Sequence, residues 1–242
     1  MDVTIFIFCY NEEVLIAKTI AHYRLFIPQC NIVILDNYST DNSVKIAKSL
    51  GCKIHQWKSR TRKNVLDLFQ MDDMKNNIWK SVKKGWVIVC DMDEWLCVTH
   101  EELDHEERKG TTVIRTRGYN IVGDSRRTDL VDIEPESVFD GVESPAMSKY
   151  LCFHRPSITD INYYHGAHGA RPEGVVKYSC KLYLHKHLHW IGLPYRIERN
   201  RMMYARTRDL TRLGHAIHYF PNDDAVKQQY QQLIQKRIHI DF

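Results

Sequence analysis

The sequence lacks the features that are typical of small disulfide-bonded secreted proteins and of membrane proteins. Its seven cysteines are an odd number, and no two of them have C-x-x-C spacing. This pattern argues against a disulfide framework or a zinc ribbon and favours reduced thiols. The N-terminal apolar run, residues 3–9, has no basic region before it and is too short for a signal peptide or a membrane span. We therefore expect a soluble, cytoplasmic protein without a transmembrane segment.

The sequence also has no internal repeat, no low-complexity linker and no glycine-rich phosphate loop. A chain of 242 residues can bury a sizeable core and is most simply a single domain, here residues 1–242. The net charge of +4 is too small to demand a nucleic acid partner, although it suits anionic small molecules. Composition alone therefore predicts a globular protein with no nucleic acid partner.

Predicted strands and helices alternate in the first part of the chain. Each β-branched, apolar run of strand length is followed by a segment with apolar residues at helical spacing. This alternation predicts an α/β fold, in which a mostly parallel sheet carries helices on its faces. The expected strands are residues 3–9, 31–35, 52–57 and 87–91, and the expected helices are residues 13–26, 42–50 (with Gly51 as C-cap) and 66–84.

The pattern changes after Asp93. Further strands are expected at residues 111–116 and 147–153, and a polar helix is expected at residues 223–238. The stretch between the two strands, residues 117–144, is polar and rich in turn residues. Such a stretch is typical of long loops that lie over a functional site.

Polar loops follow several of the predicted parallel strands. In open sheets of this kind, ligands bind outside the carboxyl ends of the strands, where such loops converge. This convergence is stronger evidence for a site than any one loop. The loops are residues 10–12, 36–40, 60–64 and 91–94.

Asp91 and Asp93 follow the most apolar of these strands, two residues apart. On a continued strand, that spacing places both carboxylates on one side of the backbone, where they repel each other. A divalent cation removes the repulsion, and carboxylate oxygens suit magnesium or manganese, which are usually shared with substrate phosphates. The alternative is a solvated strand terminus without a metal.

Three ordered motifs resemble a known family. Residues 8–13 (FCYNEE), 35–41 (LDNYSTD) and 91–93 (DMD) are similar to those of nucleotide-sugar glycosyltransferases with the GT-A fold. The similarity is to the family-two-like group, whose members build bacterial surface polysaccharides and glycoproteins of large algal viruses. Later in the chain, residues 149–156 followed by His165, and then residues 184–192, resemble that group more weakly.

The resemblance implies a nucleotide site at the ends of the first strands. A nucleobase needs an aromatic or apolar wall with a few polar groups, and a ribose diol needs a carboxylate acceptor. Asp91 would face the ribose or reach a metal through water. The implied nucleotide-binding residues are Phe8, Tyr10, Asn11, Glu12, Asp36, Arg62, Asn64 and Asp91.

The resemblance also implies that Asp91 and Asp93 form the D-x-D motif, with Asp93 as the better ligand of manganese or magnesium. The cation would neutralise charge on the leaving nucleoside diphosphate. A histidine from the second half would complete the site, and His187 best matches the family block. His185 and His189 share its face if this segment is a strand, and they remain alternatives, as does His165.

An inverting enzyme also needs a carboxylate that takes the proton from the acceptor hydroxyl. Family spacing favours Asp160, with Glu143 as the second candidate and Asp140 as a further alternative. Inversion itself is implied by the resemblance alone.

The sequence thus predicts a metal-dependent transferase that moves a sugar from a nucleoside diphosphate sugar, with UDP favoured, to a glycan hydroxyl. Residues 1–100 would bind the nucleotide, and residues 101–242 would bind the acceptor and complete the metal site. One alternative is a non-catalytic domain that binds nucleotide sugars or glycans. Another is a haloacid-dehalogenase-like phosphatase, in which D-x-D opens the domain and a small pair such as Gly-Thr follows; here Glu94 and Trp95 follow.

Overall fold

The computed structural model describes residues 1–60, 65–123, 134, 137–212, 219 and 222–242. The chain divides into two compact units. The first unit consists of Met1–Lys58, Leu68–Tyr119 and Glu143–His187, and the second of Ser59–Asp67, Asn120–Val142 and Leu188–Phe242. Because these units interleave, they do not follow the predicted halves 1–100 and 101–242, and the single domain stays a prediction.

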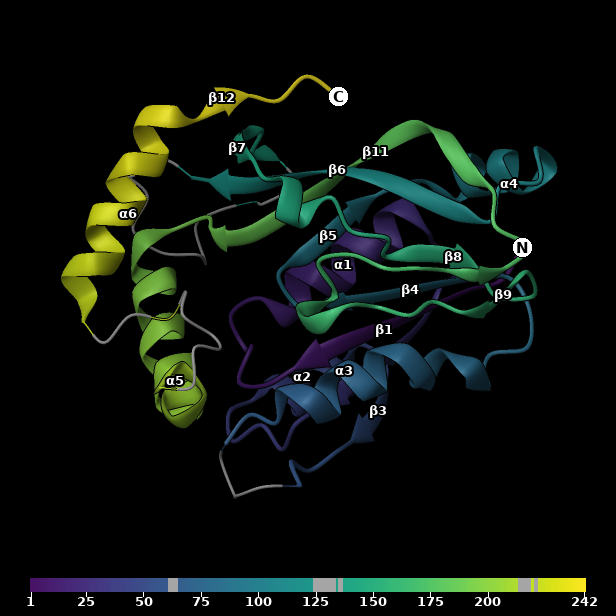
Figure 1. Cartoon of the computed structure of the whole chain (residues 1–242). Coiled ribbons are helices and arrows are strands. Elements are labelled where there is room, and N and C mark those ends of the chain that lie inside the picture. Colours follow the sequence, from purple (N-terminus) through teal and green to yellow (C-terminus); the bar gives the residue numbers. More distant parts are fainter. Residues whose placement is uncertain (61–64, 124–133, 135–136, 213–218, 220–221) are drawn as a thin grey trace. The chain divides into compact units, whose positions relative to one another are not determined.

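A mostly parallel sheet organises the first unit. Its parallel part has the order β4-β1-β2-β3, and β1 and β4 run side by side in Figure 1. On the other side of β4, the short strand β8 pairs antiparallel with it and also pairs with β6. The α/β fold class is therefore confirmed. The strands are β1 (Val3–Cys9), β2 (Asn31–Asp36), β3 (Lys53–Gln56), β4 (Trp86–Asp91), β6 (Val113–Val122) and β8 (Cys152–His154).

The parallel strands form where the sequence is apolar on both faces. In β1, six of the seven residues are buried, and in β4 the first five of six are buried. A strand covered on both faces reads as a continuous apolar run, which explains why these strands were predicted closely. Helices connect them: α1 (Ile16–Phe26), α2 (Ser43–Ser49), and α3 (Leu68–Asn77) with the 3-10 helix η1 (Ile78–Ser81). A further helix, α4 (His100–Arg108), lies between β4 and β6 along the chain.

Shorter elements complete the first unit. Strand β5 (Glu94–Cys97) pairs antiparallel with β11 (Tyr178–Trp190), and the ladder aligns Glu94 with His187. Strands β9 (Ile158–Asp160) and β10 (Glu173–Gly174) form a separate antiparallel pair. Two 3-10 helices, η4 (Pro145–Met147) and η5 (His165–Ala167), lie in the same part of the chain.

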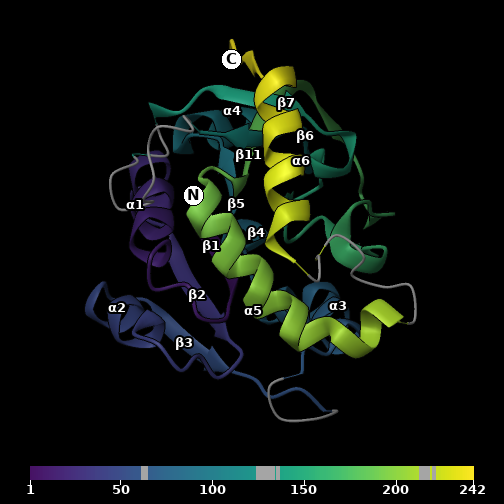
Figure 2. The ribbon, with the colours of Figure 1, turned by 90° about the vertical axis from the view of Figure 1, so that its left-hand side faces the viewer.

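The second unit contains α5 (Leu193–Arg212) and α6 (Asp223–Lys236), which are neighbours in Figure 2. Strand β12 (Ile238–His239) pairs antiparallel with β7 (Asp140–Glu143). Apolar side chains from three segments make its core: Val122, Trp190, Val226 and Tyr230.

Several boundaries differ from the predictions. The predicted helix 66–84 breaks after α3 into η1, and the predicted strand 147–153 shrinks to Cys152–His154. Strand β6 extends to Val122, so the predicted loop 117–144 begins with six strand residues. Seven of the ten residues of β6 are buried, but Arg115, Arg117 and Asn120 interrupt its apolar run, so its sequence pattern is weaker than that of a central strand.

Candidate active site at the carboxyl ends of the parallel strands

The sheet register brings the predicted site segments to one edge. Cys9 at the end of β1 is level with Asp36 in β2, and Phe8 is level with Asp91 in β4. Since adjacent strands lie about 4.8 Å apart, Asp36 and Asp91 are roughly 10 Å apart across β1. The spacing is that of a small-ligand site in an open α/β sheet.

Hydrogen bonds from backbone N–H groups join the loops after β1 and β2. The Asn11 N–H donates to Ser39 Oγ at 2.9 Å, and the Thr40 N–H donates to Asn11 Oδ1 at 2.7 Å. The Glu12 N–H donates to Ser43 Oγ at 2.7 Å. Asn11 has a left-handed φ of 52°, which asparagine tolerates better than most residues. These contacts make one rigid wall from two predicted nucleotide-binding loops.

Asp36 is fully buried and shapes its own loop. Its Oδ1 accepts from the Ser39 N–H at 3.1 Å, and its Oδ2 accepts from Gln56 Nε2 at 3.2 Å. A carboxylate oxygen can accept more than one hydrogen bond, so these contacts leave acceptor capacity for a ligand. The turn role is visible in the structure, and the nucleotide role stays a prediction.

Phe8 is buried, with 6% of its surface exposed, and it packs edge-on against Trp57 at 6.2 Å between ring centroids. Lys75 Nζ lies 5.3 Å from the Phe8 ring centre. Trp57 was not predicted as part of the site, although an aromatic residue at the end of the third strand was a usable signal. Of the other predicted nucleotide residues, Tyr10 is half-buried, and Arg62 and Asn64 lie outside the described residues.

The strand β4 ends at Asp91, and the chain turns at Met92 and Asp93. The expectation that both aspartates continue one strand face is therefore wrong, because the turn breaks the two-residue period. The two carboxylates instead have different partners. Asp91 is 2.9 Å from Lys75 Nζ, and Asp93 Oδ2 is 3.6 Å from His187 Nε2.

Two hydroxyl groups of helix α1 hold the turn at Met92 and Asp93 in place. Thr19 Oγ1 donates to the Met92 carbonyl, and Tyr23 Oη donates to the Glu94 carbonyl, both at 2.9 Å. Both donors are fully buried. The position of Asp93 between these two carbonyls is therefore fixed by the packing of α1.

Glu94 and two lysines form a buried ionic network behind the aspartates. Glu94 Oε1 lies 2.5 Å from Lys149 Nζ, and its Oε2 accepts from the Asp91 N–H at 3.0 Å. Burial alone would raise the pKa of Glu94, but Lys149 and Lys75 outweigh it and hold this pKa well below its ordinary value. Burial alone would lower the pKa of Lys75, and Asp91 and Glu94 instead raise it to about 12. Glu94 and Lys75 are therefore charged at neutral pH.

Sequence reasoning missed Lys75, Lys149 and the role of Glu94. Lys75 is 16 residues from Asp91 along the chain, and Lys149 is 55 residues from Glu94. No motif or spacing links such positions, because only the folded chain brings them together.

The histidine candidates lie in different surroundings. His185, His187 and His189 alternate on β11 as predicted and share one face of that strand. His185 is fully buried, its Nδ1 lies 2.5 Å from the Met147 carbonyl, and burial lowers its pKa to about 4. His187 faces Asp93, whereas His189 belongs to the second unit.

The predicted bases both have cationic partners. Asp160 forms an ion pair with Lys80, next to η1. Glu143 accepts two hydrogen bonds of 2.9 Å from Arg117, and these bonds lower the pKa of the exposed Glu143 carboxyl. A lower pKa makes a weaker base, so the contact with Arg117 counts against Glu143 unless the acceptor displaces it.

The structure bears on the predictions about disulfides and membrane spans. All seven cysteines lie in the described residues, and none forms a disulfide there. Within the same part of the chain, no helix is both long and apolar enough to cross a membrane.

Solved structures with a similar fold include the crystal structure of S. aureus TarS, at a TM-score of 0.48 and 16% identity, covering 85% of this chain and 39% of TarS. Another is glucosyl-3-phosphoglycerate synthase from Mycobacterium tuberculosis in complex with Mn²⁺, UDP and glucosyl-3-phosphoglycerate. It has a TM-score of 0.34 and 16% identity, and the match covers 48% of this chain and 44% of that one. TarS has also been solved in complex with UDP-GlcNAc.

Among curated proteins, Protein RfbJ of Shigella flexneri is 34% identical over 65 residues. These residues are 27% of this chain and 50% of RfbJ, so the chain spans about half the length of this relative. The family model "Glycosyl transferase family 2" matches residues 4–96, which contain β1 to β4, Asp36, Asp91 and Asp93. This match covers less than half of the chain, and it agrees with the family that the sequence motifs resemble.

Proposed function

We propose that the protein is a metal-dependent glycosyltransferase that moves a sugar from a nucleoside diphosphate sugar to a glycan hydroxyl, with inversion. One observation carries the proposal: within a family 2 domain, Asp93 and His187 face each other beside Asp91 at the end of β4. UDP is favoured as the nucleotide because UDP-sugars are the most frequent donors among the glycosyltransferases that the sequence motifs resemble.

The residues present fit a divalent cation. Asp93 offers a carboxylate oxygen and His187 an imidazole nitrogen, and manganese accepts both kinds of ligand. The 3.6 Å between these two atoms is close to the separation of two ligands on one metal ion. Asp91 reaches the same cation through water in this proposal, since Lys75 already compensates its charge. When bound, the metal supplies positive charge for the diphosphate.

The remaining steps belong to the residues of the chain. The wall formed by Asn11, Ser39 and Thr40 limits the space for the nucleoside, and Asp36 accepts hydrogen bonds from it. Lys75 adds a permanent positive charge near the phosphates. Asp160, or Glu143 in its place, takes the proton of the attacking hydroxyl as the sugar is transferred.

The non-catalytic alternative keeps the nucleotide site but has no base. The ion pair of Asp160 with Lys80 is the observation that favours it, because a carboxylate held by a lysine must be released before it can accept a proton. The family 2 match over residues 4–96 favours glycosyl transfer over the phosphatase alternative.

Isothermal titration of UDP with manganese, and again with EDTA, tests the proposal. Tighter binding with manganese is expected, and equal affinity under both conditions contradicts a metal-dependent site. A panel of UDP- and GDP-sugars, assayed for slow hydrolysis without acceptor, then separates an enzyme from a binding domain. Cleavage of no donor would favour the binding domain.

A further inference from the structure

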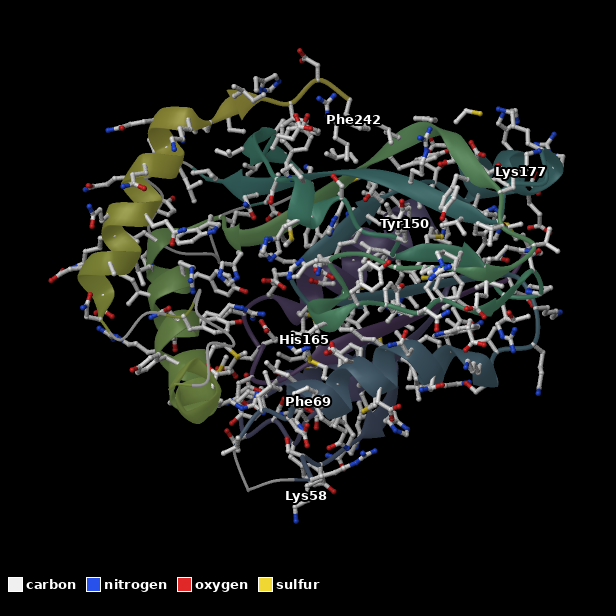
Figure 3. The ribbon with its side chains drawn as sticks, in the orientation of Figure 1. Lys58, Phe69, Tyr150, His165, Lys177 and Phe242 are labelled. Atoms are coloured by element: carbon white, nitrogen blue, oxygen red, sulfur yellow. The ribbon has the colours of Figure 1, made fainter. Side chains whose placement is uncertain are left out.

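Two aromatic rings lie at the surface where α3 meets the loop that contains η5. Phe69 at the start of α3 is 66% exposed, and its ring centre lies 5.9 Å from that of His165, with 35° between the ring planes. Figure 3 shows these two side chains next to each other. The next residue back from His165, Tyr164, is 60% exposed. Exposed aromatic rings that lie side by side offer apolar faces that a ligand can cover.

Helix α3 holds the loop in one conformation. His165 Nδ1 donates to Asp72 Oδ2 at 2.5 Å, because the carboxylate can only accept, and the Gly166 N–H donates to Asp72 Oδ1 at 3.2 Å. The Tyr163 N–H donates to Asn76 Oδ1 at 2.7 Å. The rings are therefore pre-organised, which lowers the entropy that a ligand must overcome.

The loop also adopts a strained backbone. Gly166 and Ala167 are consecutive residues with left-handed φ values of 73° and 56°. A left-handed alanine is unfavourable, and such conformations concentrate at sites that clamp ligands.

One contact and one helical neighbour pair link the loop to the end of β4. Lys149 Nζ, which pairs with Glu94, also lies 3.4 Å from the Gly166 carbonyl. Asp72 is one helical turn before Lys75, which pairs with Asp91, and residues three apart on a helix are neighbours. The aromatic pair is therefore adjacent to the strand end where the donor sugar would react.

We propose that Phe69 and His165 form a binding subsite for a neutral hexopyranose ring of the acceptor glycan. The assignment of this subsite to the acceptor rests on the proposed function, whereas the binding of a sugar at the subsite does not depend on it. The C–H face of a pyranose is apolar and covers the Phe69 ring, while its hydroxyls donate to and accept from the Asp72 and His165 pair. The carboxylate of Asp72 disfavours a phosphate at this position.

Methyl glycosides of glucose, galactose, mannose and rhamnose are the probes. Their binding is measured by saturation-transfer NMR titration, with and without UDP and manganese, and UDP affinity is measured in parallel. Phe69→Ala should weaken the best glycoside by about fivefold or more and leave UDP affinity unchanged, whereas Phe69→Tyr keeps the ring and should bind like wild type. Leu25→Ala, on α1 and 69% exposed, is the matched control and should change neither affinity.

Asp72→Asn should also weaken the glycoside, because it removes the charge that orients His165, and thermal melting shows whether the variant is folded. Glycoside binding that is absent from wild type under both conditions, or equal in wild type and Phe69→Ala, overturns the subsite. Loss of UDP affinity in Phe69→Ala with unchanged glycoside affinity overturns it too, since the ring then stacks on the nucleobase. Phe69-dependent glycoside binding without any UDP binding supports the subsite and contradicts the proposed function instead.

Discussion

The end of β4 and the ends of β1 and β2 lie at the same edge of one sheet, but different forces hold them in place. At the end of β4, three carboxylates face nitrogen groups from distant segments: Asp91 faces Lys75, Asp93 faces His187, and Glu94 faces Lys149. At the ends of β1 and β2, backbone N–H groups donate across the loops to hydroxyl, amide and carboxylate oxygens, as from Thr40 to Asn11 and from Glu13 to Asp41.

Because of this difference, we expect the two regions to respond differently to a charged ligand. Ion pairs in a buried site are sensitive to any new charge, so a cation or a phosphate at the β4 end can change the partner of a carboxylate. Hydrogen bonds from backbone N–H groups involve no ion pair, so they are less sensitive to a new charge and mainly fix the shape of the loops. We therefore expect substitutions at the β4 end to affect charge-dependent properties, and substitutions in the wall to have smaller effects on affinity.

The largest expected effect lies outside both regions, at the predicted base. Because a base acts only in the transition state, Asp160→Asn should lower kcat by about 10²–10⁴-fold and leave donor affinity nearly unchanged. Glu143→Gln, made in parallel, serves as the comparison, and both are assayed for UDP binding and for transfer. Two variants with wild-type transfer would refute both assignments and make Asp140 the next candidate.

At the β4 end, Lys149→Met should lower the free energy of unfolding by about 3–5 kcal/mol, because it leaves the buried Glu94 carboxylate without its main partner. Urea unfolding at pH 7 measures the loss. Lys181→Met, which breaks a more exposed pair with Glu102, is the control and should cost less than about 1 kcal/mol.

The effect of Lys149→Met on stability should also depend on pH. The folded pKa of Glu94 lies below its unfolded value of about 4.3, so its stabilisation is present above that pH and is lost as the pH falls further. The difference between wild type and Lys149→Met should therefore be largest near pH 7 and shrink as the pH is lowered below about 4. A difference that stays constant down to pH 3 would show that Glu94 is not the cause.

The third prediction separates the two aspartates of the motif. Asp93→Asn should weaken the manganese-dependent part of UDP affinity by at least about tenfold, or 1.4 kcal/mol, because Asp93 faces His187 and is the proposed direct ligand of the metal. Asp91→Asn should cost less, since Lys75 compensates this carboxylate already. Titration of UDP with and without manganese measures both, with the exposed Asp104→Asn as control. A larger loss in Asp91→Asn would reverse the assignment of the direct ligand.

The smallest expected effect belongs to Asp36, which accepts a hydrogen bond from the Ser39 N–H of the wall. Asp36→Ala should weaken UDP by about 0.5–1.5 kcal/mol, the value of one hydrogen bond, and more if a charged group is involved. Asp36→Asn keeps an acceptor for the Ser39 N–H and separates the loss of the turn from the loss of the ligand contact. Wild-type affinity in both variants would leave Asp36 with a turn role alone.

The sequence predicted the central strands well because they are buried on both faces and read as apolar runs. The strand expected at residues 3–9 is β1, and the strand ending at Asp91 is β4. The weakly patterned parts were harder. Helices α4 and α5 were not predicted, since their many polar residues hide the period of the buried face, and strand β5 was not predicted because its four residues are too few to show a period.

Sequence alone thus determined the α/β class, the family motifs and the edge of the sheet where the loops converge, because these depend on local patterns and on the rule that parallel strands present their carboxyl ends together. Only the tertiary structure decided which groups meet there. The pairs Asp91–Lys75, Glu94–Lys149 and Asp72–His165 join residues 16, 55 and 93 positions apart. No local pattern encodes such pairs, since they form only when the helix α3 and the later loops pack against the end of β4.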